Sequence, residues 1–121
     1  MMTRIDARDR LIVALDVPSA AEADALVARM GDQVRFVKVG LELYTVAGPD
    51  IVRKLVDRGK RVFLDLKFLD IEETVRRATA RVAAMGATFL TVHANRKALI
   101  AAVQGRGSSD LKLLAVTVLT N

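Results

Sequence analysis

Five short runs of apolar and β-branched residues recur along the chain about 25 residues apart. They cover residues 11–17, 36–40, 61–68, 89–94 and 113–120. The first run is apolar at every position from Leu11 to Leu15, which is typical of a strand buried on both faces of a parallel sheet. The pattern therefore predicts five buried strands.

Segments with helical periodicity separate these strands. Ser19 and Glu22 match a capping box that opens a first helix, and Pro49 falls in the first turn of a second. A fourth, less regular helix covers roughly residues 95–104. In the third predicted helix, the residues that share one face are Ile71, Thr74, Val75, Ala78, Val82 and Met85.

A glycine follows each predicted helix, at Gly31, Gly59, Gly86 and Gly105, where a left-handed cap residue is expected. Strands that alternate with helices pair in parallel through right-handed crossovers. Two α/β architectures fit: a complete doubly wound sheet of five strands, or part of an eight-stranded barrel. A closed barrel needs about 250 residues, so this chain would supply about four and a half of its βα units.

The composition is that of a globular protein, and we expect a single domain over residues 1–121. The absence of cysteine excludes disulfides and thiolate metal sites, and one histidine cannot make a multi-histidine metal site. The first ten residues lack the apolar core of a secretory signal, and no apolar run is long enough to span a bilayer. We therefore expect a cytoplasmic protein without a metal or a membrane partner.

The formal net charge of +5 favours anionic ligands. Aromatic residues make up only 4% of the chain and no arginine-rich arm is present, so nothing indicates nucleic-acid binding. Many of the cations fall on outward helix positions, which is typical of a solvated surface: Arg53, Lys54, Arg58, Arg76, Arg77 and Arg81.

Charged residues stand inside or just after three of the apolar strands. Asp16 ends the first, Lys38 lies in the second, Asp65 and Lys67 lie in the third, and Asp70 follows closely. Sites in parallel α/β proteins form at the carboxyl ends of strands. We therefore expect these five side chains at that edge of the sheet.

Lys67 is the central candidate in this group. Asp65 and Lys67 are two residues apart and share one face of a strand, and Asp70 could approach Lys67 from the far side. Opposite charges favour the protonated lysine, which makes it a proton donor rather than a nucleophile. The alternative is a buried salt bridge with Asp70 as the N-cap of the third helix.

The sequence of these strands resembles orotidine 5′-phosphate decarboxylase over residues 10–121. The resemblance rests on Leu-Asp-Val at 15–17, Lys-Val-Gly-Leu-Glu at 38–42, Asp-Leu-Lys-Phe-Leu-Asp-Ile at 65–71 and Val-Thr-Val-Leu-Thr at 116–120. The Asp-x-Lys-x-x-Asp element also occurs in related sugar-phosphate decarboxylases. The resemblance implies the N-terminal half of a TIM barrel and cofactor-free decarboxylation of orotidine 5′-phosphate to uridine 5′-phosphate.

The resemblance also implies residue roles. Lys67 would protonate the ring carbon that loses carbon dioxide, Asp65 would face the departing carboxylate, and Asp70 would complete the charged array. Lys38 would bridge this array and the ribose. In the family Asp70 reaches the site of the partner subunit, as does the threonine at position 74, which implies a homodimer. The remaining substrate-binding residues would be Asp16, on the ribose hydroxyls, with Thr74 and Thr120 lining the nucleotide site.

The chain departs from the family pattern at several points. Glu73 replaces the usual asparagine and adds a negative charge, and the segment 95–98 does not match. The family continues through three further units, which supply the phosphate-binding arginine and glutamine and a mobile loop. We expect His93 to be a core or interface histidine, and residues 105–109 to be a plain loop.

Two other functions fit the pattern less well. A non-catalytic half-barrel that self-associates would explain Glu73 and the altered 95–98 segment. A receiver-like signalling domain would need a second acid beside Asp16 and a lysine after the fifth strand, where Leu119 and Thr120 stand instead.

Overall fold

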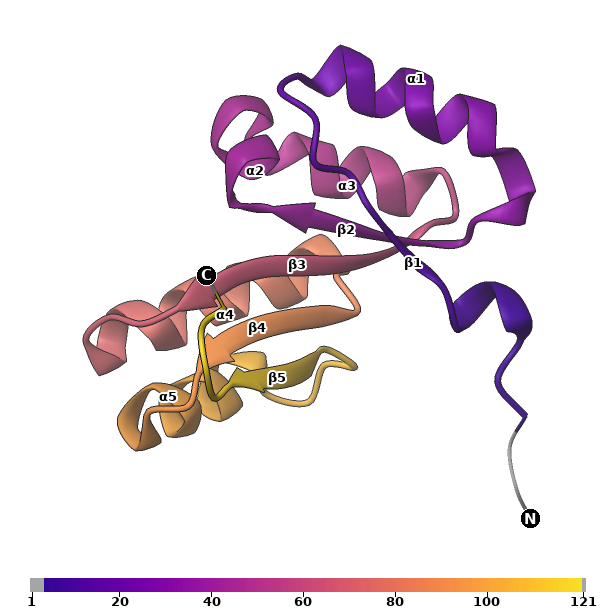
Figure 1. Cartoon of the computed structure of the whole chain (residues 1–121). Helices are drawn as coiled ribbons and strands as arrows, with labels where there is room; N and C mark the ends of the chain where they lie inside the picture. The colour runs from indigo at the N-terminus through magenta and orange to yellow at the C-terminus, as the bar shows by residue number, and fades with distance from the viewer. Residues whose placement is uncertain (1–3, 121) are drawn as a thin grey trace. The chain divides into compact units, whose positions relative to one another are not determined.

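The computed structural model describes residues 4–120 as alternating strands and helices (Figure 1). The strands are β1 (Ile12–Ala14), β2 (Phe36–Gly40), β3 (Arg61–Phe68), β4 (Phe89–His93) and β5 (Lys112–Val116). The α-helices are α1 (Ala20–Met30), α2 (Leu41–Ala47), α3 (Asp50–Asp57), α4 (Glu72–Met85) and α5 (Arg96–Arg106). Two 3₁₀ turns, η1 (Ala7–Asp9) and η2 (Gly31–Gln33), complete the regular structure.

The strands follow one another across the sheet in chain order, β1-β2-β3-β4-β5. β1 pairs with β2 in parallel, with Ile12 opposite Phe36, and β4 pairs with β5 in parallel, with Phe89 opposite Lys112. A doubly wound sheet reverses its strand order at a switch point, whereas consecutive units of a barrel do not. The order confirms the predicted parallel α/β fold and favours the partial barrel.

The chain divides into two compact units, the first ending at Phe63 and the second beginning at Leu64 within β3. In the first unit, α1, α2 and α3 lie over the same side of β2 (Figure 1). Its core consists of apolar residues, mostly from α1, α2, α3, β2 and β3 and all at most 2% exposed: Leu15, Ala23, Val27, Phe36, Val37, Val39, Leu43, Ile51, Val52, Leu55 and Val62.

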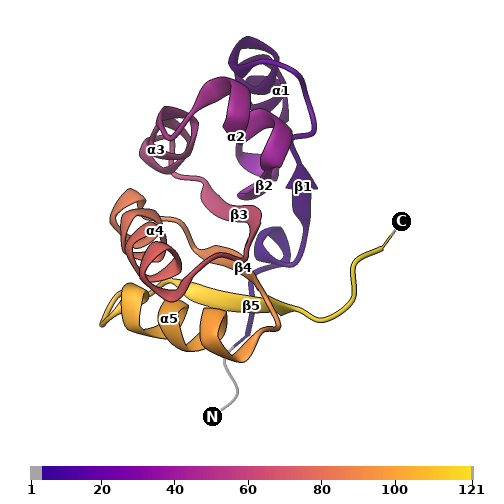
Figure 2. The ribbon, with the colours of Figure 1, turned by 90° about the vertical axis from the view of Figure 1, so that its left-hand side faces the viewer.

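In the second unit, α4 and α5 pack side by side next to β4 and β5 (Figure 2). Its buried residues are again mostly aliphatic: Leu64, Val75, Val82, Leu90, Val92, Ala98, Ala101, Ala102 and Leu111. Each unit has a core of its own, so the single domain expected over residues 1–121 stays a prediction. Within the described part of the chain, no helix has both the length and the apolar character needed to cross a membrane.

The predicted helix ends are mostly confirmed. The Ser19 hydroxyl accepts a hydrogen bond from the Glu22 backbone N–H at 3.2 Å and donates one to Glu22 Oε2 at 2.9 Å. Gly31, Gly59 and Gly86 have positive φ values of 55°, 81° and 85°. These are backbone conformations that glycine adopts without steric cost, so the glycines end their helices as expected.

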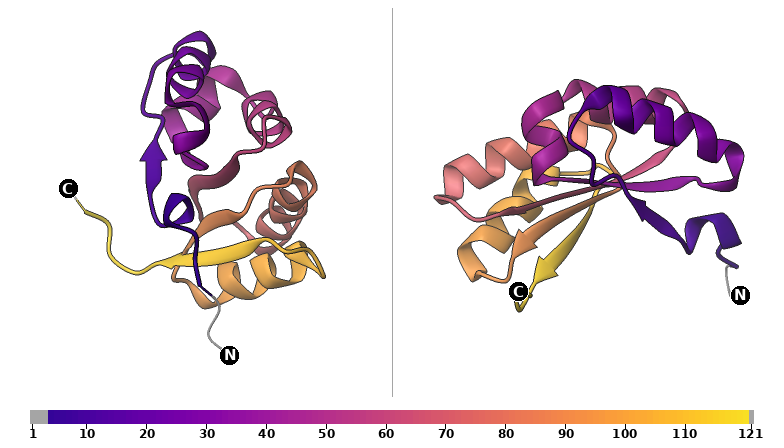
Figure 3. Two further views of the ribbon diagram at one scale, coloured as in Figure 1. Left: turned by 90° about the vertical axis from the view of Figure 1, so that its right-hand side faces the viewer. Right: turned by 45° about the horizontal axis from the view of Figure 1, so that its top comes forward.

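Several element boundaries differ from the predictions. The second helix, predicted to have Pro49 in its first turn, is α3 with Pro49 as its N-cap, and a further helix that was not predicted, α2, precedes it and ends at Gly48 (φ 71°). β1 covers residues 12–14 rather than 11–17, and β5 ends at Val116 rather than at residue 120. Beyond Val116 the chain continues without regular structure (Figure 3). The side chains of Val118 and Leu119 in this segment are exposed.

The prediction that Gly105 caps the fourth helix was wrong. Gly105 lies inside α5, and the positive-φ cap residue is Gly107 (φ 56°). A Cβ at Gly105 would overlap the backbone carbonyl of Arg76 in α4 and lie 3.0 Å from Thr79 Cβ. The missing side chain therefore allows α4 and α5 to approach closely, which no local sequence rule could indicate.

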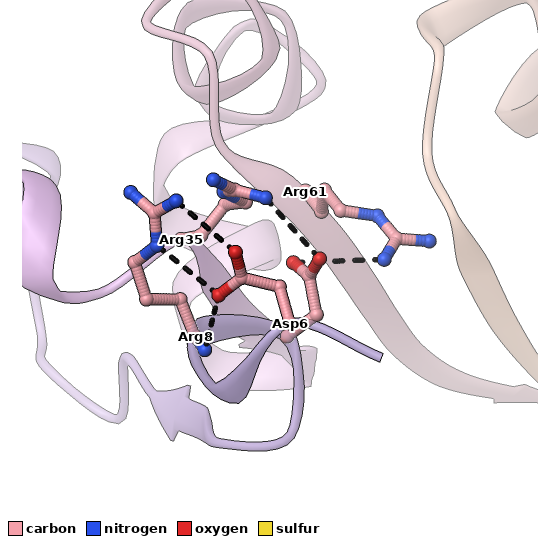
Figure 4. Close-up of polar contacts among 5 residues, drawn as sticks. Asp6, Arg8, Arg35 and Arg61 are labelled. Atoms are coloured by element: carbon pink, nitrogen blue, oxygen red, sulfur yellow. Dashed lines mark hydrogen bonds and ion pairs between the residues drawn. The ribbon is translucent and has the colours of Figure 1, made fainter. Parts of the chain in front are cut away.

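A polar cluster joins η1 to the amino ends of β2 and β3 (Figure 4). Arg35 and Arg61 pair with Asp9 at 3.3 Å and 3.6 Å, while the Arg8 side chain turns back to Asp6 with two contacts of 3.2 Å. Arg61 also lies 4.8 Å from the centre of the Phe36 ring, within cation–π range. The cluster lies at the amino ends of the strands, where a structural role is expected.

We predict that Gly105→Ala destabilises the protein by about 1–3 kcal/mol, the usual cost of overpacking, although alanine is the better helix former. Thermal or urea unfolding measures the effect. Gln104→Ala, at the exposed neighbouring position of the same helix, is the matched control and should leave stability almost unchanged. Equal stability of the Gly105→Ala variant and the wild type would contradict the close approach.

The hydrogen bonds from the Arg8 side chain and backbone lower the pKa of Asp6 to about 2 from its usual 3.8. A lowered pKa in the folded state means that the stabilising contact is present above pH 3.8 and is lost as pH falls toward 2. We predict that Arg8→Ala moves the Asp6 pKa part of the way back, because the backbone N–H remains. Carboxyl-carbon NMR titration measures it, with Arg10→Ala as the control that leaves it near 2.

Candidate active site

Asp65 and Lys67 form an ion pair near the carboxyl end of β3. Lys67 Nζ lies 3.0 Å from Asp65 Oδ1, and the two residues share one face of the strand as predicted. The Asp65 side chain is only 13% exposed, whereas that of Lys67 is 43% exposed. The carboxylate is therefore held within the protein while the ammonium remains accessible to a ligand.

The backbone of Lys67 is in the left-handed region, with φ 51°. Among residues 4–120 it is the only residue other than glycine with a positive φ. Such conformations are costly for residues with a Cβ and are concentrated at functional sites, where the surrounding structure holds them. Lys67 is thus fixed in an unusual orientation at the point where β3 leads into the turn before α4.

Thr91 in β4 connects the two residues of the ion pair. Its Oγ1 accepts a hydrogen bond from the Lys67 backbone N–H at 2.9 Å and donates one to Asp65 Oδ1 at 2.7 Å. Thr91 is 6% exposed. Sequence reasoning missed this residue, although a hydroxyl in the otherwise apolar run 89–92 was a usable signal.

A pocket of about 250 Å³ opens between the end of β3 and the first turns of α4. Three predicted site residues line it, Lys67, Asp70 and Thr74, together with the apolar Leu66, Phe68 and Leu69. An ammonium at the wall of a partly apolar pocket can stabilise negative charge on a ligand atom and deliver a proton to it. The pocket therefore brings these three residues together, and the roles predicted for them stay predictions.

Asp70 does not complete the charged array around Lys67 within one chain. Its Oδ1 accepts a hydrogen bond from the Ile71 backbone N–H at 2.7 Å. No ion pair between Asp70 and Lys67 is present in the part of the chain that the structure describes. Asp70 also is not the N-cap of α4, because Ile71 occupies that position.

In the first unit, Asp16 follows the carboxyl end of β1 by two residues, and Lys38 is the middle residue of β2. Lys38 is opposite Ala14, and its carbonyl accepts a hydrogen bond from the Leu15 N–H at 2.9 Å. Asp16 Oδ1 lies 3.6 Å from the position that a Cβ would take at Gly40. The expectation of a position at the carboxyl edge of the sheet is therefore met by Asp16, whereas Lys38 lies within β2 beside the last residue of β1. Thr120 is exposed in the segment beyond β5.

Two arginines neutralise Glu73, the acidic residue that replaces the usual asparagine. Arg76 Nη2 and Arg77 Nε lie 2.6 Å and 2.7 Å from Glu73 Oε1, all on the exposed side of α4. The side-chain hydrogen bond from Arg76 lowers the pKa of Glu73 below its usual value. The added negative charge is thus balanced locally.

The unusual segment after β4 has a structural explanation. Asn95 is the N-cap of α5, and its Oδ1 accepts a hydrogen bond from the Ala98 backbone N–H at 3.1 Å. His93 ends β4 and is half-buried. The predicted loop 105–109 begins two residues later, because Gly105 and Arg106 belong to α5.

Comparison with known protein families gives one clear match. The family described as "Orotidine 5'-phosphate decarboxylase / HUMPS family" matches residues 9–121. An orotidine 5′-phosphate decarboxylase of Bradyrhizobium diazoefficiens is 54% identical over 114 residues, which cover 94% of this chain and 48% of the relative. An orotidine 5′-phosphate decarboxylase of Rhodopseudomonas palustris is 50% identical over 121 residues, which cover all of this chain and 52% of the relative.

Solved structures agree with this match. The crystal structure of orotidine 5′-phosphate decarboxylase from Lactobacillus acidophilus superposes with a TM-score of 0.83 at 42% identity, over 91% of this chain and 53% of that one. The crystal structure of orotidine 5′-phosphate decarboxylase from Pyrococcus horikoshii superposes with a TM-score of 0.74 at 28% identity, over 87% of this chain and 50% of that one. The chain thus spans about half the length of the curated relatives it matches. It belongs to the orotidine 5′-phosphate decarboxylase / HUMPS family.

Proposed function

We propose that this chain supplies the proton-donating part of a site that decarboxylates orotidine 5′-phosphate to uridine 5′-phosphate. The observation that carries the proposal is the Lys67–Asp65 ion pair of 3.0 Å at the end of β3, beside a pocket. Family membership supports it, because the named relatives carry this activity in their names.

The chemistry needs a cation beside one carbon of the substrate. Loss of carbon dioxide leaves the electron pair of the broken bond on the ring carbon. The Lys67 ammonium stabilises this charge as it develops and then transfers a proton to the carbon, which leaves a neutral amine that solvent reprotonates. Asp65 holds the ammonium in place and faces the departing carboxylate. No cofactor takes part in this scheme.

The other predicted residues would bind the nucleotide. Lys38 would bridge the charged array and the ribose, and Asp16 would bind ribose hydroxyls. Thr74 and Thr120 would line the nucleotide site. Thr74 already lines the pocket beside Lys67. These assignments come from the family resemblance, and the position of Asp16 just beyond the carboxyl end of β1 supports its role.

We further propose that the protein works as a cytoplasmic homodimer. In the family, Asp70 and Thr74 act in the site of the partner subunit. Both are exposed in this chain, and Asp70 hydrogen-bonds to its own helix instead of to Lys67. An exposed carboxylate that does not pair with the lysine of its own chain is what an intersubunit role requires.

We predict that Lys67→Ala lowers kcat at least about 100-fold, because general acid catalysis and charge stabilisation contribute factors of this size. The relatives are about twice as long as this chain. The assay therefore uses the chain alone and the chain joined to the C-terminal part of the Bradyrhizobium diazoefficiens relative. Conversion of orotidine 5′-phosphate is followed spectroscopically at several protein concentrations.

Lys54→Ala, on the exposed side of α3, is the matched control and should retain full activity. A folded fusion without turnover would contradict the proposed function and favour a non-catalytic scaffold. Turnover that persists in Lys67→Ala would remove Lys67 from the mechanism. Activity of the chain alone that rises more than linearly with concentration would show that copies assemble a working site.

We also predict that Glu73→Asn changes kcat/KM less than about threefold, because Arg76 and Arg77 already balance the charge of Glu73 at an exposed site. Steady-state kinetics of the same fusion measures the effect. The double variant Arg76→Ala/Arg77→Ala leaves Glu73 unbalanced and should raise KM for the anionic substrate. A tenfold gain in kcat/KM for Glu73→Asn would show that the glutamate repels the substrate despite its partners.

A further inference from the structure

We propose that Thr91 is the positioning residue that holds both ends of Lys67 in place for proton transfer. The inference rests on the proposed function of Lys67 but concerns a different residue on a different strand. One hydroxyl contacts the Lys67 backbone nitrogen at 2.9 Å and Asp65 Oδ1 at 2.7 Å. The same Asp65 oxygen lies 3.0 Å from the Lys67 ammonium. A closed set of contacts therefore runs from the backbone of Lys67 to its own side chain.

The directions of these hydrogen bonds follow from which of the groups can donate a proton and which can only accept one. A backbone N–H can only donate, and an ionised carboxylate can only accept. The Thr91 hydroxyl must therefore accept from Lys67 and give its single proton to Asp65. A hydroxyl at this position satisfies both neighbours, whereas an apolar side chain would satisfy neither.

The backbone contact determines where the Lys67 side chain points. At φ 51°, Lys67 occupies a conformation that an L-residue leaves unless its surroundings hold it. The φ angle of a residue sets the direction of its Cα–Cβ bond relative to the preceding chain, so a return of Lys67 to a negative φ would shift the ammonium relative to Asp65. The hydrogen bond from Lys67 N–H to a buried side chain of β4 opposes that return.

Thr91 itself is not placed to touch a substrate. It is 6% exposed, and it is not among the residues that line the pocket beside Lys67. Its β-branched side chain has restricted χ1 freedom, so the hydroxyl keeps one direction at little entropic cost. It therefore acts through Lys67 and Asp65 and not on the ligand.

The test compares Thr91→Val, which keeps the shape and removes the hydroxyl, with Thr91→Ser, which keeps the hydroxyl. In the 121-residue chain, NMR measures amide hydrogen exchange at Lys67 and its backbone carbon shifts. Loss of one hydrogen bond should speed exchange about tenfold in Thr91→Val and move the shifts away from left-handed values. Thr91→Ser should remain close to the wild type.

Thr79→Val is the matched control. Thr79 is a fully buried threonine of the same unit whose hydroxyl has no hydrogen-bond partner in the described structure, so its loss should not affect Lys67. In the active fusion, Thr91→Val should lower kcat about tenfold or more with KM within about twofold, and Thr91→Ser should recover most of that loss. If Thr91 had only a structural role, its variants would lose stability, and kcat would not recover in Thr91→Ser.

The following results would decide whether Thr91 positions Lys67. Unchanged Lys67 exchange and shifts in Thr91→Val would overturn the inference, as would a serine variant that behaves like valine. If Thr91→Val does not fold, the wild type still provides a test: Lys67 must show left-handed shifts and the Thr91 hydroxyl proton must exchange slowly. An inactive fusion with the expected NMR changes would refute the proposed function and leave the positioning contact established.

Discussion

Parallel pairing of apolar strands is the constraint on which the structure depends. The inner strands β2 and β4 need apolar residues because they are largely covered, and Val37, Val39, Leu90 and Val92 are fully buried. The prediction of five buried strands was wrong for β1 and β5, which contain no buried residue. Burial of a charged group is costly, and the charged residues Lys38 in β2 and Asp65 in β3 are only partly buried. Within each unit the parallel register brings the carboxyl ends of adjacent strands to the same edge. A site at that edge follows from the way the core is built.

The contacts among Asp65, Lys67 and Thr91 are the exception to this apolar rule in the second unit. A partly buried ion pair is a weak source of stability, because the cost of desolvation offsets the attraction. A positive φ at lysine adds a further cost. A scaffold would gain little from either feature, whereas a proton donor needs a fixed direction and a charged form. The partly buried ion pair and the positive φ, both costly and both at Lys67, therefore support a functional interpretation better than a structural one.

Local patterns in the sequence predicted those features that depend on local chemistry. The strands at 36–40 and 61–68 have the predicted bounds, because apolar runs and flanking turns define them. The shared face of Asp65 and Lys67 follows from strand periodicity alone. The start of a helix at Pro49 was predicted, but helix α2 before it was missed, although Gly48 was a readable signal for a helix end.

Other features depend on contacts between segments distant in sequence. Gly105 looks like a helix cap in the sequence, but its role is to admit the carbonyl of Arg76 from a neighbouring helix. The left-handed backbone of Lys67 is not indicated by lysine itself, and it is held by a hydroxyl 24 residues away. Neither could be derived without the tertiary structure, because the residue type at each position is compatible with several conformations.

The division of the chain into two units separates two proposed tasks. The ion pair, the threonine that orients it and the adjoining pocket all belong to the unit that begins at Leu64. Asp16 and Lys38, proposed to hold the ribose, belong to the unit that ends at Phe63. Binding energy from parts of a substrate that do not react raises the rate only if those parts hold the reacting carbon against the catalytic group. The direction fixed at Lys67 therefore determines how much of the binding energy from the rest of the nucleotide is used at the reacting carbon in the proposed decarboxylation.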